Sequence, residues 1–219
     1  MKGLRITLAA GVAAAMALTC MPAHADEQSG IAVGFRTGYA IPIGAAKSGL
    51  SLGSLEGGKI PFWFDLGYRF SPHLYVGGFF EYGITFTPVH TCGGGAGSAL
   101  SCEGADMRGG IDFQYHFLPG QSVNPWAGLG IGYEQSRTRY EQEGTETSLI
   151  YYGFQFIDLQ AGADLGVSKS IPFGPFVDLS FGQFSHEAYK DTAGSSSDVP
   201  MQSKLHEWLT LGVRGELDL

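Results

Sequence analysis

Apolar residues occupy every second position along most of residues 60–86. A two-residue period is typical of a β-strand, because successive side chains point to opposite faces. The alternation pauses at Ser71-Pro72-His73 and then resumes, which predicts a hairpin with a short turn. One face is small, polar or charged, and the other is apolar and rich in aromatics. The apolar face carries Ile60, Phe62, Phe64, Leu66, Tyr68 and Phe70, then Leu74, Val76, Phe80, Tyr82, Ile84 and Phe86. This pattern predicts a hairpin of a transmembrane β-barrel, with the apolar face toward lipid.

The same alternation recurs along the rest of the chain. In one of the predicted strands, residues 149–167, the apolar set changes parity halfway. A β-bulge near Phe156 and Ile157 would reconcile the two halves. The predicted strands cover about residues 31–43, 60–70, 74–86, 106–117, 125–137, 149–167, 171–184 and 204–219.

The connections between these strands alternate between long and short. The long ones are residues 44–59, 87–105, 138–148 and 185–203. Outer-membrane barrels combine short periplasmic turns with longer extracellular loops, so all the long loops fall outside if the N-terminus is periplasmic. We therefore predict an all-β fold, an eight-stranded antiparallel up-and-down transmembrane β-barrel. It forms one domain over residues 26–219.

A soluble β-sandwich or lipocalin-like barrel is the alternative fold. Those folds also alternate, but their apolar side chains face inward and their polar ones face water. Here the polar face is rich in glycine, and the chain holds 34 Gly with only 16% charged residues. That composition suits a lipid-facing surface better than a water-facing one.

Residues 1–25 have the pattern of a cleaved secretory signal peptide. Lys2 and Arg5 precede an apolar segment, residues 6–18, that is too short to span a bilayer as a helix. Ala23-His24-Ala25 matches an A-x-A cleavage site, so the mature chain is expected to begin at Asp26. Cys20 raises the alternative of a lipoprotein, but the residues before it, Ala17-Leu18-Thr19, do not fit a lipobox.

The net charge bears on the kind of partner, and the cysteine content bears on disulfide formation and metal binding. The formal charge is −8, and it becomes −10 once two basic signal-peptide residues are removed, which argues against a nucleic-acid partner. Cys92 and Cys102 are the mature cysteines, and an oxidising compartment favours a disulfide between them. Two free thiols remain the alternative. No metal site and no cofactor are predicted.

Taken together, the signal peptide, the amphipathic strands and the alternating loops resemble the small Gram-negative outer-membrane β-barrels of the OmpA, OmpX and OmpW type, a porin-like group. The resemblance covers residues 26–219 and rests on pattern rather than on a motif. Members usually end in an aromatic residue, whereas this chain ends Leu217-Asp218-Leu219. The resemblance implies Sec-type export and an integral, monomeric protein of the cell outer membrane. Its expected partners are outer-membrane lipid, lipopolysaccharide, the barrel-assembly machinery and an extracellular ligand at the loops.

Ionisable residues at inward positions are the main candidates for a functional site. An eight-stranded barrel is just wide enough for side chains, and charges removed from water must be paired. We expect an ion-pair network that plugs the lumen, with a gated pathway as the alternative. Its predicted members are Arg36, Asp65, Arg69, Glu81, Arg108, Asp112, Glu134, Asp158, Asp178, Arg214 and Glu216.

Catalysis is not predicted. Ser185-His186-Glu187 has the residue types of a catalytic triad, but neighbours on a strand point to opposite faces, whereas a triad converges in space. His116 shares the predicted lumen face with Asp112, as expected of a hydrogen-bonded interior. The predicted function is a structural or surface-interaction role through the extracellular loops. A narrow gated channel or transporter for small or apolar solutes, and a lipid A-modifying enzyme, are the alternatives.

Overall fold

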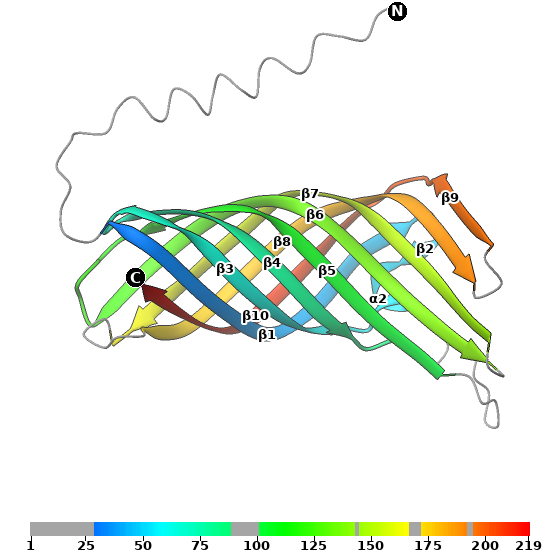
Figure 1. Ribbon diagram of the computed structural model, residues 1–219, viewed down its shortest axis with the longest axis horizontal. Coiled ribbons are helices and arrows are strands. Elements are labelled where there is room, and N and C mark those ends of the chain that lie inside the picture. Colours follow the sequence, from blue (N-terminus) through cyan, green and yellow to red (C-terminus); the bar gives the residue numbers. More distant parts are fainter. Residues whose placement is uncertain (1–28, 89–100, 143–144, 167–171, 192–194) are drawn as a thin grey trace, which may run out of the picture.

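The chain forms one antiparallel sheet that closes into a ring (Figure 1). This computed structural model describes residues 29–88, 101–142, 145–166, 172–191 and 195–219. The first long strand pairs with the last, in a register that runs from Ala32 opposite Asp218 to Gly44 opposite His206. The predicted eight-stranded barrel is therefore confirmed. The ring strands are β1 (Gly30–Lys47), β3 (Lys59–Ser71), β4 (Leu74–Thr85), β5 (Ser101–His116), β6 (Val123–Gln142), β7 (Thr145–Leu165), β8 (Phe173–Asp191) and β10 (Leu205–Asp218).

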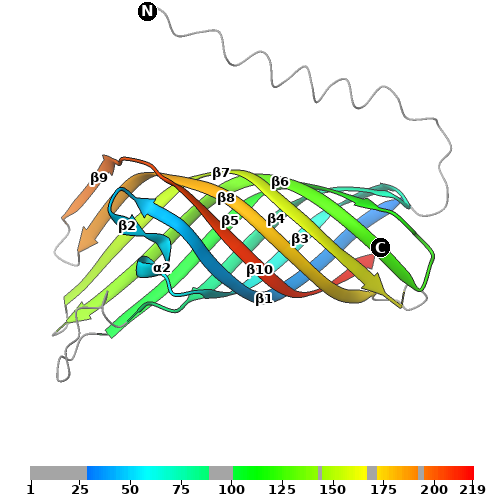
Figure 2. The same cartoon turned by 180° about the vertical axis from the view of Figure 1, so that it is seen from behind.

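The two ends of the barrel differ. We call the end with the β3–β4 and β5–β6 connections and the C-terminus the turn end, and the opposite end the loop end. Three short elements lie between the ring strands at the loop end: β2 (Leu50–Ser51), α2 (Leu52–Leu55) and β9 (Ser196–Pro200) (Figures 1 and 2). Sequence alternation predicted loops for all three segments. The structure shows that they add a helix and sheet pairings there: β2 pairs with β1, and β9 with β8.

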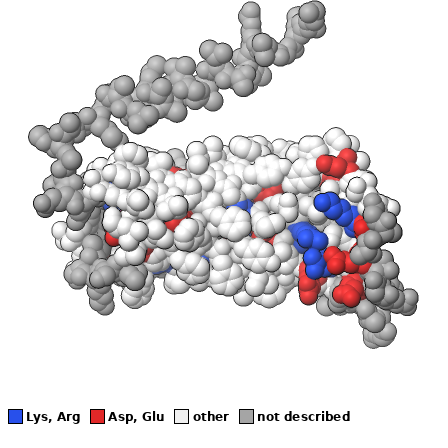
Figure 3. All heavy atoms as spheres, in the orientation of Figure 1, with Lys and Arg blue, Asp and Glu red and all other residues white. Residues whose placement is uncertain are grey.

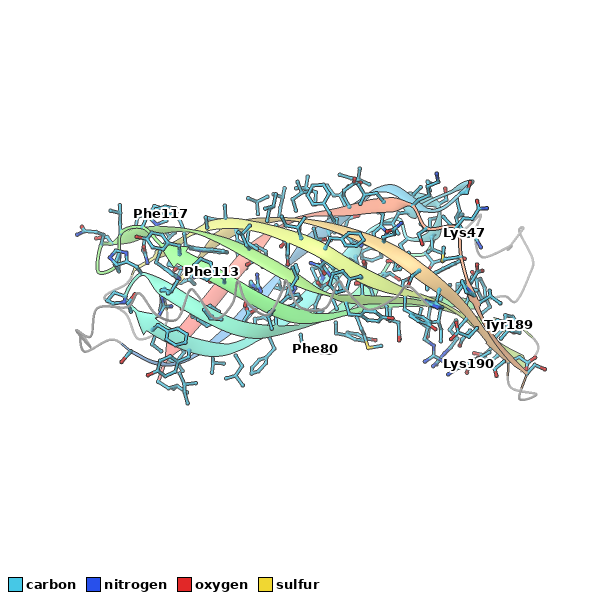
Figure 4. All side chains as sticks on the ribbon, turned by 90° about the horizontal axis from the view of Figure 1, so that it is seen from above. Lys47, Phe80, Phe113, Phe117, Tyr189 and Lys190 are labelled. Carbon is cyan, nitrogen blue, oxygen red and sulfur yellow. The ribbon has the colours of Figure 1, made fainter. Side chains whose placement is uncertain are left out.

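Within the predicted strands, the side chains alternate between the two faces as expected. Apolar side chains cover the outside. In Figure 4, Phe80, Phe113 and Phe117 lie along the barrel wall, whereas Lys47, Tyr189 and Lys190 lie at the loop end. Phe80 is 52% exposed, whereas Trp63 and Trp208 on the opposite face are 1% and 0% exposed. An apolar outer surface around a polar, close-packed interior is the arrangement of a barrel that faces lipid.

Two β-bulges shift the register between β7 and β8. Phe156 is an extra residue in β7 opposite β8, since Gln155 pairs with Gly182 and Ile157 with Phe181. This confirms the predicted bulge. The second bulge was not predicted: between Tyr152–His186 and Gly153–Phe184, Ser185 is the extra residue of β8. Because a bulge reverses the parity beyond it, His186 points outward and Glu187 inward.

Several strands continue well past their predicted ends. β6, β7 and β8 have 20, 21 and 19 residues, whereas β4 has 12. The predicted loops 87–105, 138–148 and 185–203 were therefore too long, because main-chain pairing continues after the apolar alternation stops. Cys102 lies in β5, while Cys92 and the signal-peptide residues 1–25 lie outside the described residues. The disulfide and the cleavage site stay predictions. No helix in the described ranges has the length and apolarity to cross a membrane.

Candidate functional site

Ionic side chains fill the lumen from the turn end to the loop end, and we call them the lumen network. At the turn end, Arg69 of β3 forms an ion pair with Glu216 of β10. Its Nε also donates to Asp218 Oδ1 at 2.9 Å. Arg69 and Glu216 lie on strands separated only by β1, so the pair bridges the inner face of that one strand.

The next layer is built around Arg214 of β10. Its Nε and Nη2 donate to the two carboxylate oxygens of Asp164 at 2.8 and 2.9 Å. Its Nη1 donates to Gln114 Oε1 at 2.6 Å, and its guanidinium lies 3.7 Å from the Trp126 ring centre. A forked carboxylate and a stacked indole are contacts that suit a planar guanidinium and not an ammonium. Arg214 is thereby fixed in one orientation.

Arg36 of β1 holds the middle of the lumen. Its guanidinium forms a bidentate ion pair with Asp65 of β3, in which Nε donates to Oδ2 at 2.8 Å and Nη2 donates to Oδ1 at 2.5 Å. Nη1 donates to Gln160 Oε1 at 2.8 Å, and Asp112 lies 3.8 Å from Nη2. Trp63 stacks over the guanidinium at 5.2 Å. Arg36 is 1% exposed, so its charge depends on these partners for stabilisation.

Nearer the loop end, two cations share two carboxylates. Lys59 pairs with Glu81 at 2.9 Å and with Asp106, and Arg108 pairs with the other oxygen of Glu81. Arg108 Nη1 also donates to Ser180 Oγ at 2.8 Å. These four charged side chains are each at most 1% exposed. Charges at this depth depend on one another for stabilisation, because no water replaces a missing partner.

Glu134 of β6 is held by uncommon donors. His206 Nε2 lies 2.8 Å from its Oε2, and Trp208 Nε1 donates to its Oε1 at 2.7 Å. Both partners belong to β10, which lies on the far side of the lumen from β6. Glu134 thus joins opposite walls of the barrel.

Two predicted members of the network lack a cation. Asp158 and Asp178 face the lumen at 1% and 0% exposure but form no ion pair in the described part of the chain. Asp158 Oδ2 accepts from Gln160 Nε2 at 3.3 Å. The structure thus brings nine of the eleven predicted residues into ion pairs with one another or with their neighbours, and it leaves these two beside them.

Sequence reasoning missed four ionic residues of the interior. Lys59 begins β3, directly before a predicted strand, and Asp106 of β5 is the first residue of another predicted strand; both have inward parity. Asp164 has the inward parity of Asp158 and could have been found in the same way. Glu56 lies in a predicted loop, where no periodic signal reports the direction of a side chain.

The triad-like segment does not converge. Ser185 Oγ and His186 Nδ1 are 3.0 Å apart, and the His186 ring stacks on Tyr152 outside the barrel. Glu187 instead points inward and accepts from Lys47 Nζ at 2.6 Å. As predicted for neighbours on a strand, the carboxylate and the imidazole lie on opposite faces of the sheet, and the bulge at Ser185 decides that Glu187 is the inward one. In the described residues, no group of three or more His, Cys, Asp or Glu side chains could hold a metal ion.

Charged side chains on the outer surface gather at the loop end, as the face drawn in Figure 3 shows. Arg139 Nε donates to Glu146 at 2.9 Å, and Arg137 lies 3.6 Å from the same carboxylate. Arg137 Nη2 also donates to Ser148 at 2.9 Å, and Ser148 pairs in register with Lys190. Arg137, Arg139 and Lys190 thus form a basic group on the outer face of β6–β8.

Comparisons with known proteins report on the fold. No protein-family model matches the chain, and no curated protein matches it. A solved major outer-membrane protein from Thermus thermophilus superposes with a TM-score of 0.55 at 12% identity, over 86% of this chain and 99% of that one. Neisserial surface protein A superposes with a TM-score of 0.51 at 15% identity, over 88% and 100%. This chain has the fold of the small outer-membrane β-barrels.

Proposed function

We propose that the protein is an integral outer-membrane barrel with a closed lumen and a surface-interaction role at its loop end. The orientation follows the usual topology of such barrels, which puts the short turns in the periplasm and the loop end outside the cell. The apolar outer surface supports membrane embedding, since Phe80, Leu129 and Leu211 are 52%, 53% and 56% exposed.

The filled lumen is the observation that carries this proposal. Three tryptophans, Trp63, Trp126 and Trp208, lie inside it at no more than 1% exposure, together with the paired arginines and lysine. An eight-stranded barrel leaves room for side chains and little else. A role in bulk diffusion of solutes would need an open path along this axis, so the surface is the better candidate for function.

The outer surface at the loop end offers the contacts. A transmembrane β-strand needs about 9–11 residues. β6 and β7, at 20 and 21 residues, therefore continue several residues beyond the bilayer. Their extensions carry Arg137 and Arg139, and β8 adds Lys190. Arginine forks bind phosphate oxygens well, which makes the phosphates of lipopolysaccharide the partner that this basic group fits best.

Conductance and lipid binding test the two halves of the proposal separately. The purified protein in a planar bilayer should show no large steady conductance, and porin-sized channels would contradict the closed lumen.

Lipid binding is tested in detergent, where added lipopolysaccharide should raise the temperature at which the protein unfolds and loses its folded gel mobility. Replacing Arg137, Arg139 and Lys190 together by alanine should reduce that rise, whereas replacing Lys204 by alanine should not. An equal rise in both variants would contradict the surface role of the basic group.

A further inference from the structure

Residues 52–58 pack against inward-facing side chains at the loop end of the barrel through Leu52 and Leu55, and we call them the cap. α2 begins after Ser51, whose Oγ accepts a hydrogen bond from Ser54 N at 3.1 Å. Leu52 and Leu55, at 0% and 2% exposure, are buried in an apolar cluster. The other buried members of that cluster are Ala40, Ala46, Tyr151, Phe184 and Trp208. Burial of two leucines holds the cap in place.

Glu56 anchors the end of the cap. Its backbone N–H donates to Leu52 O at 2.8 Å, and its side chain turns into the lumen at 1% exposure. Ser136 Oγ of β6 donates to Oε1. Oε2 has no hydrogen-bond partner among the described residues, although it is buried. A buried carboxylate held by a single hydroxyl is poorly stabilised as an anion.

Every other carboxylate around Glu56 already has its own partners. Glu134 of β6 contacts His206 and Trp208 of β10. Lys59 and Arg108 form ion pairs with Glu81 of β4, and Lys59 also pairs with Asp106 of β5. Lys59 of β3 and His206 of β10 attract the charge of Glu56, whereas Glu134 and, from β5, Asp106 repel it. Among the described residues around it, Glu56 is therefore the carboxylate that lacks an ion pair.

Protonation is the remaining way to satisfy this carboxyl group. Burial, reinforced by Glu134, raises the pKa of Glu56 to about 7, against the opposing effects of Lys59, Ser136 and His206. In a released cap, Glu56 would be in water and would have its ordinary pKa of 4.5. The docked cap therefore binds a proton that the released cap gives up.

We propose that residues 52–58 form a proton-dependent cap, docked in the mouth of the barrel while Glu56 is neutral and released to the outside when Glu56 ionises. Docking is strongest below the ordinary pKa of Glu56. It weakens as the pH rises from there to the pKa of the docked state, by about tenfold per pH unit, and changes no further above it. The proposal concerns the mouth of the barrel and does not depend on what binds its outer surface.

Hydrogen exchange of the peptide that covers residues 52–58 tests the cap. The wild type is compared with Glu56→Gln at the same pH, so that the intrinsic pH dependence of exchange cancels. Glutamine has the shape of the neutral acid and cannot ionise. The ratio of the wild-type rate to the variant rate should rise more than about tenfold between pH 5 and pH 8. A ratio that stays constant over this range would overturn the proposal.

Control variants distinguish the effect of Glu56 protonation from the effect of apolar packing. Leu55→Ala should speed exchange by the same factor at both pH values, because it removes buried apolar contact and no titrating group. Glu103→Gln, on the exposed part of β5, should leave the exchange of this peptide unchanged. If Glu56→Gln fails to fold, Ser136→Ala replaces it. Loss of the hydroxyl that stabilises the anion should then speed exchange more at pH 8 than at pH 5, and an equal effect would contradict the cap.

Discussion

Asp65 binds the guanidinium of Arg36 on the neighbouring strand, not that of Arg69, four residues further along its own strand. Both arginines share the lumen face with Asp65. Residues four apart on a strand are separated by roughly 13 Å, whereas facing residues on adjacent strands are about 5 Å apart at Cβ. A shared face is thus insufficient for contact, and the register between strands decides which charges meet.

Loss of Arg36 should destabilise the barrel strongly. Arg36→Ala leaves the Asp65 carboxylate buried without its bidentate partner, and we expect the free energy of unfolding to fall by about 3–5 kcal/mol. Urea unfolding in lipid vesicles, followed by tryptophan fluorescence, measures this change. Lys190→Ala is the matched control, because Lys190 is an exposed cation outside the lumen. Equal losses of unfolding free energy in the two variants would mean that the Arg36–Asp65 ion pair contributes no more to stability than an exposed cation does.

Charge on the outer wall should be costly where the wall meets lipid. Phe80 lies near the middle of β4 with its ring directed outward. Phe80→Arg should lower the stability in lipid vesicles by about 2–4 kcal/mol, as expected for arginine at the bilayer midplane. Phe80→Leu keeps an apolar side chain and should change stability much less. A soluble, fully folded Phe80→Arg protein in the periplasmic fraction would contradict membrane embedding.

Cys92 should be dispensable for assembly. If the predicted disulfide to Cys102 exists, it closes a small loop at the loop end and stabilises that loop by at most a few kcal/mol. Cys92→Ala should therefore insert into the outer membrane and keep the heat-shifted gel mobility of the wild type. Failure of this variant to assemble would show that the segment before β5 has a larger role in folding.

Glu134 joins β6 to β10 across the lumen, and its charge should matter more than its shape. Glu134→Gln keeps the volume but offers one acceptor oxygen to two donors, His206 Nε2 and Trp208 Nε1. The expected loss is about 1.5–3 kcal/mol, the range for hydrogen bonds to a charged group. Urea unfolding measures it, with Glu141→Gln on the exposed strand end as the control. No difference between the two would argue that the His206 contact is incidental.

The wall of this barrel could be predicted from the sequence, and the contacts inside it only in part. Alternation identified the lipid-facing side and even the bulge at Phe156, because burial in lipid constrains every second residue. It could not show that Arg69 meets Glu216 or that Arg214 meets Asp164, because those partners lie on strands that are not adjacent.

The loop end was the hardest part to predict. There the strands leave the bilayer, so alternation stops while main-chain pairing continues to Gln142 and Asp191. The bulge at Ser185 and the buried position of Glu56 also carry no periodic signal, because one inserted residue or one short helix can turn a side chain in either direction.

The pairing of the first strand with the last has a consequence for the order of folding. Arg69 finds both its carboxylates on β10, and Glu134 finds both its donors there. A nascent sheet that lacks this final strand would therefore hold several unsatisfied charges on its concave side. Such an intermediate is unfavourable in lipid, so insertion and closure should occur as one cooperative step, with truncated chains degraded rather than accumulated.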